Sequence, residues 1–234
     1  MKGFLRTVRF VRQMFLAVFF LLLLPALLTG VAARWEVITL AVLYFLFLLG
    51  PLWPAMRYGR FSKNDETPEV KRQFGWRMST ILGIYAMHWI AVLDFSKGLW
   101  LFAKPSLVFL SGVDTTWISA LGLTLVATGG IIAASAVQTL GVFFDRLIIK
   151  EKHHLVTNGL YSLVRHPVYL AYIFLYAGVC IAMQSLVALG VLILFGVPWF
   201  GAHIEIEEAL LAKHFGGAFT AYQQRTKKLF PFIY

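Results

Sequence analysis

Cysteine, charge and polar linkers are all scarce in this 234-residue chain. Cys180 is the only cysteine, which excludes an internal disulfide and a CxxC metal site. Charged residues make up 14% of the sequence, whereas a soluble globular domain has about 25%. No Ser- or Gly-rich linker divides the chain, so we expect one domain over residues 1–234.

Apolar residues dominate what is present. They account for 59% of the sequence, and the mean hydropathy is +0.76. The composition predicts an all-α, polytopic integral-membrane helical bundle. The net charge of +10 does not require a nucleic-acid partner, because Lys and Arg collect in the cytoplasmic loops of membrane proteins.

Six stretches are apolar and long enough to be spanning helices. We expect a kink at Pro25, an end to the second helix at Pro51 and Pro54, and a close pair of final helices joined near Gln184-Ser185. This final pair is short and could form one tight helical hairpin. A further apolar stretch, 105–113, is short and reads as interfacial or re-entrant. The six stretches are 14–33, 37–53, 76–93, 117–140, 168–183 and 186–200.

The N-terminal stretch has the basic start of a signal peptide. Its apolar run is longer than the usual 7–15 residues or so, and we therefore predict an uncleaved helix. The fourth stretch is rich in small residues, Gly122, Gly129 and Gly130 among them, which allows close helix packing.

Basic residues fall in alternate connections, which predicts the orientation of the bundle. Six spans place both termini, the fourth-to-fifth connection and the tail on the cytoplasmic side. The opposite connections carry only Arg34, Lys97 and Lys104. The cytoplasmic set comprises Lys2, Arg6, Arg9, Arg12, Arg57, Arg60, Lys63, Lys71, Arg72, Arg77, Arg146, Lys150, Lys152, Arg165, Lys213, Arg225, Lys227 and Lys228.

The connection His153–Tyr169 is polar and aromatic and lies between two apolar runs. Thr157-Asn158-Gly159 predicts a turn in which Gly159 takes a positive φ. Arg165 offers a fork suited to a carboxylate or phosphate, and Pro167 suits the first turn of a helix. These parts suit a zwitterionic cofactor with an aromatic ring. A capped juxtamembrane turn with interfacial aromatics explains the same residue types equally well.

The segment after the sixth stretch carries four polar residues that are candidates for chemistry. On a helix, His203 and Glu207 form one i,i+4 pair, and Glu205 and Glu208 form an i,i+3 pair that points elsewhere. At least one acid is therefore expected to face the loop, with Arg165 as its counter-charge. The alternative is a solvated helix start whose acids complement the helix dipole.

Two other polar features were weighed. The histidines show no HxxH or HExxH spacing, so we expect no metal. His88 lies inside the third apolar stretch, where we expect a packed, hydrogen-bonded side chain, and Asp94 is expected near the outer interface.

The loop resembles the signature of the integral-membrane methyltransferases, which include the isoprenylcysteine carboxyl and the phospholipid N-methyltransferases. The pattern H-x-L-V-T-x-G-x-Y-x-x-V-R-H-P-x-Y is present in full from His153 to Tyr169. Upstream, Leu140-Gly141 and Phe143-Phe144 also resemble this family. The resemblance covers about residues 135–234, and its ending is matched by Glu207-Glu208, Leu211, Phe215-Gly216, Tyr222 and Pro231.

The resemblance implies an S-adenosylmethionine site on the cytoplasmic side, lidded by the C-terminal segment, with a lipophilic acceptor that comes from the bilayer. It implies a variable N-terminal part, 1–115, and a methyltransferase core, 116–234. Arg165, Glu207, Glu208 and His203 would be catalytic. The cofactor would contact His153, Leu155, Val156, Gly159, Tyr161, His166, Pro167 and Tyr169.

This chain departs from the family pattern at three positions. His203 stands where members often have Arg, Ala171 where many have Gly, and Leu160 where Pro or Val is common. The missing Arg weakens the case for a carboxylate acceptor, and an isoprenylcysteine-like carboxylate, a thiol and a lipid amine stay open. Two other functions also stay open: an NADPH-dependent membrane reductase of the sterol-reductase type, and a non-enzymatic membrane protein.

Overall fold

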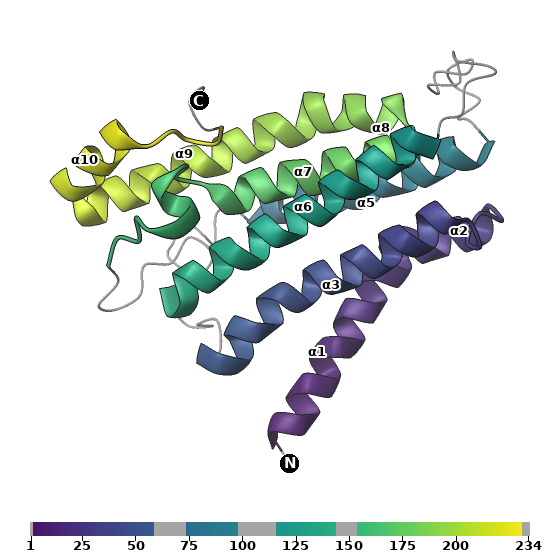
Figure 1. Ribbon diagram of the computed structural model, residues 1–234, viewed down its shortest axis with the longest axis horizontal. Coiled ribbons are helices and arrows are strands. Elements are labelled where there is room, and N and C mark those ends of the chain that lie inside the picture. The colour runs from purple at the N-terminus through teal and green to yellow at the C-terminus, as the bar shows by residue number, and fades with distance from the viewer. Residues whose placement is uncertain (1, 59–73, 98–115, 144–153, 231–234) are drawn as a thin grey trace.

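A computed structural model describes residues 2–58, 74–97, 116–143 and 154–230, and all regular structure in these ranges is helical. The expected re-entrant piece 105–113 and His153 lie outside the described residues. Figure 1 shows an elongated bundle of long helices, from which the N-terminal helix diverges. The main helices are α1 (Lys2–Val18), α2 (Leu24–Leu28), α3 (Trp35–Tyr58), α5 (Phe74–Lys97), α6 (Thr116–Leu140), α7 (Pro167–Ala182), α8 (Leu186–Val191), α9 (Val197–Phe215) and α10 (Gly217–Arg225).

Helices cover all six predicted stretches, and three of them are long and apolar enough to cross a membrane. These three are Val11–Leu28, Thr116–Leu140 and Leu186–Phe215. The apolar helices Trp35–Gly50, Leu82–Ser96 and Pro167–Ala182 are shorter. The chain is thus a helical integral-membrane protein, while the count of six spans, the hairpin and the orientation stay predictions.

Two helix ends expected from the sequence are wrong. The second helix does not end at Pro51 and Pro54, because α3 continues to Tyr58. A proline removes only one backbone donor, and neighbouring groups in a membrane bundle can compensate for it. The last helix does not end near Phe200, since helical structure runs from Leu186 to Phe215. The acids of this segment therefore lie inside a long helix and not at a helix start.

Short π-helical turns precede two prolines of these long helices. The π turn Phe19–Leu23 stands just before Pro25, and the π turn Leu192–Gly196 just before Pro198. Because proline lacks an N–H, the carbonyl one turn earlier loses its partner, and a wider turn redistributes the hydrogen bonds. The chain stays helical through Pro25 with this altered ladder.

The closest helix contact is between α6 and α7, and it depends on glycine. A Cβ atom on Gly122 would lie 2.2 Å from the Ala182 nitrogen, and one on Gly178 would lie 2.7 Å from the Gly122 oxygen. The Ser119 hydroxyl donates to the Ala182 carbonyl at 2.9 Å, which ties the same two helix ends together. The predicted small-sided packing of the fourth helix is therefore confirmed at Gly122, whereas Gly130 faces open space.

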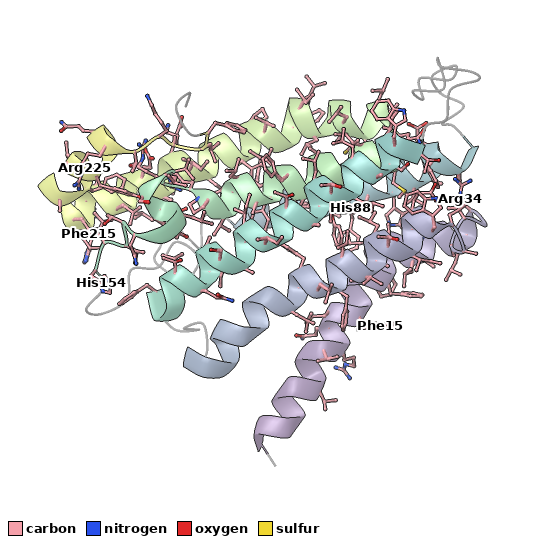
Figure 2. The ribbon with its side chains drawn as sticks, in the orientation of Figure 1. Phe15, Arg34, His88, His154, Phe215 and Arg225 are labelled. Carbon is pink, nitrogen blue, oxygen red and sulfur yellow. The ribbon has the colours of Figure 1, made fainter. Side chains whose placement is uncertain are left out.

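A buried polar pair lies in the middle of the bundle. His88 is fully buried, and its Nε2 lies 2.5 Å from the Tyr44 hydroxyl. Its Nδ1 lies 2.7 Å from the Ile84 carbonyl. Figure 2 places His88 midway along the bundle, with Arg34 at one end and His154, Phe215 and Arg225 at the other. The expected packed, hydrogen-bonded His88 is confirmed.

Gly122→Ala is expected to destabilise the bundle by about 1–3 kcal/mol, because the added methyl group must push α7 away. Gly130→Ala is the matched control on the same helix, where nothing lies within 4 Å of the new atom. Thermal unfolding of both variants in detergent measures the difference. Equal melting temperatures for Gly122→Ala and the parent protein would contradict the described α6–α7 contact.

Candidate functional site

The polar loop folds against the cytoplasmic end of α6 as predicted. Residues 154–157 carry no helix or strand, and the chain then forms a short 3-10 helix, Gly159–Ser162. Gly159 has a φ of +58°, which confirms the turn expected from Thr157-Asn158-Gly159. A Cβ at this position would lie 3.1 Å from the Thr139 hydroxyl, so glycine also permits the close approach to α6.

Part of the loop is anchored by buried side chains. Val156 and Tyr161 are buried and pack against Ala136 of α6. His154 is exposed, with its ring 4.4 Å from the ring of Phe143. Of the predicted cofactor residues, Val156 and Tyr161 therefore support the loop, and their exposed neighbours and backbone groups are left to meet a ligand.

Glu208 of α9 joins the loop, α7 and α10. Its Oε1 accepts a hydrogen bond from the Arg165 Nε at 2.8 Å and lies 3.1 Å from the His166 Nε2. Its Oε2 accepts a hydrogen bond from the Gln223 side-chain amide at 3.2 Å. The expected ion pair between Arg165 and an acid of this segment is confirmed, and the acid is Glu208.

Arg165 is also held by two backbone carbonyls. Its Nη1 donates to the carbonyl oxygens of Gln223 and Thr226 at the end of α10. The side chain is only 10% exposed. A guanidinium bound on three sides inside the protein acts first as a brace between the loop and the C-terminal segment.

The C-terminal segment lies directly on the loop. The Arg165 and His166 N–H groups donate to the carbonyls of Lys227 and Lys228, and Val164 and Lys227 form an isolated parallel bridge. The Tyr222 hydroxyl donates to the Tyr161 carbonyl at 2.6 Å. In Figure 1, α10 and the following yellow segment lie over the loop at one end of the bundle. This part of the chain can thus close over a ligand on the loop.

An aromatic row runs from the loop into the bundle. Tyr169, Tyr172 and Tyr176 follow one face of α7, and the Phe200 ring of α9 lies within 6.0–6.3 Å of all three. The Tyr169 ring also meets His166 at 5.8 Å, and the Tyr176 ring meets His88 at 5.9 Å. Pro167 begins α7, as predicted, and so positions Tyr169 in its first turn.

The remaining candidates on α9 have different environments. Glu205 is exposed, and Glu207 is 35% exposed with its Oε2 3.9 Å from the His166 Nδ1. His203 is buried against the Trp199 ring, 3.9 Å between centroids. The structure therefore brings Arg165, His166, Glu207 and Glu208 together, while His203 lies one helical turn before Glu207.

Backbone groups of the loop are available to a ligand. The N–H groups of residues 155–158 make no backbone hydrogen bond to another described residue. Exposed or half-buried N–H groups beside two helix starts suit a carboxylate, and the Tyr169 ring supplies a flat apolar face. The described residues contain no group of three metal-ligating side chains.

Comparison with known proteins places the site within a family. Residues 117–218 match the phospholipid methyltransferase family. Protein-S-isoprenylcysteine O-methyltransferase B of Arabidopsis thaliana is 32% identical over 131 residues, which cover 54% of this chain and 66% of that protein. The chain belongs to the isoprenylcysteine and phospholipid methyltransferase family.

Further relatives of the family match the same part of the chain. The protein-S-isoprenylcysteine O-methyltransferases of Tribolium castaneum and Xenopus laevis are each 32% identical, over 120 and 121 residues. These matches cover 50% of this chain in both cases, and 43% and 42% of the relatives. The chain thus spans about half the length of these relatives. The family match favours methyl transfer over the reductase alternative.

One solved structure is also similar, that of the eukaryotic intramembrane Ras methyltransferase ICMT (isoprenylcysteine carboxyl methyltransferase). It is 20% identical, covers 98% of this chain and 86% of that chain, and has a TM-score of 0.48. The family assignment rests on the sequence matches and not on this likeness.

Several residues that hold the site together were not predicted. Gln223 and Thr226 bind Glu208 and Arg165, and Trp199 packs on His203. A polar residue next to Tyr222 on a short amphipathic helix was the only available signal for Gln223. Its contact depends on how α10 folds back on the loop, which no local pattern reveals.

Tyr222→Phe is expected to loosen the C-terminal segment, at a local cost of about 1 kcal/mol for the lost hydrogen bond. Burial raises the pKa of Tyr222 to about 12, so the phenol keeps its proton at neutral pH and donates continuously. Hydrogen exchange of the amides in residues 154–166 should accelerate. Tyr85→Phe is the control, and unchanged exchange in Tyr222→Phe would contradict the role of this contact.

Proposed function

We propose that this protein is an integral-membrane, S-adenosylmethionine-dependent methyltransferase that acts on a lipophilic acceptor from the bilayer. The observation that carries the proposal is the joining of the loop, α7 and α9 through Glu208 within the segment that matches the family. An isoprenylcysteine-like carboxylate, a thiol and a lipid amine are all acceptors that a membrane-embedded site can receive. The apolar helices supply the route for such a molecule.

The described loop fits the proposed cofactor. The free N–H groups of residues 155–158 would hold its carboxylate, with Leu155 and Gly159 beside them and Tyr169 against its ring. His166 and Pro167 would fix this edge at the start of α7, and Val156 and Tyr161 would support it from beneath. When bound, the cofactor supplies a methyl group on a positively charged sulfur.

The protein contributes alignment and the exclusion of water. Methyl transfer is an in-line displacement, and holding the reacting atoms about 3–3.5 Å apart is the largest available gain. Arg165 and Glu208 hold the C-terminal segment over the loop, which would keep water from the reacting atoms. Glu207 and His203 are the other polar side chains of α9 proposed to face the acceptor.

The proposed site lies at the end of the bundle where the predicted cytoplasmic residues gather. Figure 2 places His154 and Arg225 at this end and Arg34 at the opposite end. Basic residues favour the cytoplasmic side. We therefore place the reaction, with both termini, on the cytoplasmic face.

Calorimetric titration of the detergent-purified protein with S-adenosylhomocysteine should show saturable binding at one site. The variants Tyr169→Ala and His166→Ala should lose it, because they remove the ring and the imidazole at the start of α7. NADPH, titrated in parallel, should not bind. Binding of NADPH alone would overturn the proposed function in favour of a reductase.

Arg165→Ala and Glu208→Ala should each lower turnover about 100-fold, since a displaced C-terminal segment misaligns the reacting groups. Transfer of a labelled methyl group into total membrane lipid measures this. Glu205→Ala is the matched control, because this acid lies on the same helix and is exposed. Full turnover in either variant would count against the brace.

A further inference from the structure

Two adjacent rows of side chains run along α9. Phe200, Ile204 and Glu208 form the first row, which packs on α7 and the loop. Trp199, His203 and Glu207 form the second row at the same i,i+4 spacing. The first row is fully used in holding the fold together. The second row carries three functional groups that the fold does not use in this way.

The hydrogen bonding of His203 fixes which ring nitrogen carries the proton. Its Nδ1 lies 3.2 Å from the Trp199 carbonyl oxygen, which can only accept a hydrogen bond. In the neutral ring, Nδ1 therefore carries the hydrogen, and Nε2 presents a lone pair. No described residue donates to this Nε2.

His88 shows the same local arrangement with a different outcome. Its Nδ1 also faces the carbonyl four residues earlier, and its Nε2 accepts a hydrogen bond from the Tyr44 hydroxyl inside the bundle. In one case a protein hydroxyl satisfies the lone pair. At His203, in the described part of the chain, that position is left to a ligand.

The neighbours of His203 extend this ligand-facing row. The Trp199 Nε1 atom is buried and has no hydrogen-bond partner among the described residues. An indole N–H left in this way costs free energy unless a ligand oxygen accepts from it. On the other side, Glu207 is 35% exposed, and its carboxylate is less engaged than that of Glu208, which is 13% exposed.

The charges of the site select among acceptors. Arg165 is paired with Glu208 and bound to two carbonyls, so it does not offer its charge to this row. The His203 Nε2 and the Glu207 carboxylate can only accept hydrogen bonds. A carboxylate acceptor would meet lone pairs and a like charge, whereas an ammonium group would meet complementary partners.

We propose that Trp199, His203 and Glu207 form the acceptor subsite, and that the acceptor is a lipid amine whose proton is taken by the His203 Nε2. This inference rests on the proposed methyltransferase function and deepens it. Glu207 attracts the ammonium form, and the Trp199 N–H binds an oxygen of the same lipid. His203 is then the residue that specifies an amine where an arginine would suit a carboxylate.

The step balances without a further reactant. The ammonium group transfers one proton to the His203 Nε2, which frees the nitrogen lone pair. That lone pair forms the N–C bond to the methyl carbon, and the C–S bond breaks with its electron pair on sulfur. The product is a methylated ammonium, and the imidazolium returns its proton to water.

The test uses the full-length protein in phosphatidylcholine vesicles with S-adenosylmethionine labelled in its methyl group. Three kinds of acceptor are supplied separately: the amines phosphatidylethanolamine and oleylamine, the carboxylate N-acetyl-S-farnesylcysteine, and the thiol dodecanethiol. We expect label in an amine. Label in the carboxylate or the thiol but in neither amine overturns the amine assignment, and so does no label in any acceptor by a protein that still binds S-adenosylhomocysteine. Loss of S-adenosylhomocysteine binding itself would instead overturn the proposed function.

Variants separate the roles of the three residues. His203→Gln should lower kcat for the amine about 100-fold, as expected for loss of a general base, and leave S-adenosylhomocysteine affinity unchanged. Trp199→Phe keeps the ring and should raise KM for a lipid amine with little change in kcat. Glu205→Gln is the control of matched charge on the same helix. A His203→Gln variant with the kcat of the parent protein overturns the role of His203.

Discussion

The Glu208 carboxylate is the contact on which the rest of the candidate site depends. One side chain receives hydrogen bonds or close contacts from the loop, from the start of α7 and from α10. These three segments are far apart in sequence, and Arg165 adds two carbonyls from the end of α10. Because a half-buried carboxylate needs compensating donors, the cluster forms only when all segments are in place. The loop and its lid are therefore coupled.

Glycine has a corresponding role within the bundle. Gly122 and Gly178 let α6 and α7 approach until backbone touches backbone, and Gly159 lets the loop settle on the end of α6. Close helix packing in a membrane relies on van der Waals contact and not on a hydrophobic driving force. The position of His166 and Tyr169 at the start of α7 follows from that packing. The site is consequently as rigid as the helix pair beneath it.

The two acids of the Glu207-Glu208 pair illustrate how position divides roles between identical residues. Glu208 belongs to the row that faces α7 and is occupied by protein donors. Glu207, one residue earlier, is turned about 100° around the helix and stays partly exposed. His88 and His203 differ in the same manner, since only His88 meets a hydroxyl from a neighbouring helix. Neighbours from other segments, and not residue type, separate structural from functional side chains here.

The sequence by itself determined the helical membrane class, the turn at Gly159, the start of α7 at Pro167 and the pairing of Arg165 with an acid. Each follows from hydropathy, local backbone preference or charge, which are properties of short stretches. It did not determine that α3 passes Pro51 and Pro54, or that the last helix runs on to Phe215. It also did not determine that Glu208 is the partner of Arg165, or that Gln223 joins them. Those outcomes belong to the tertiary structure, because they depend on which groups from distant segments are near enough to satisfy a buried donor or acceptor.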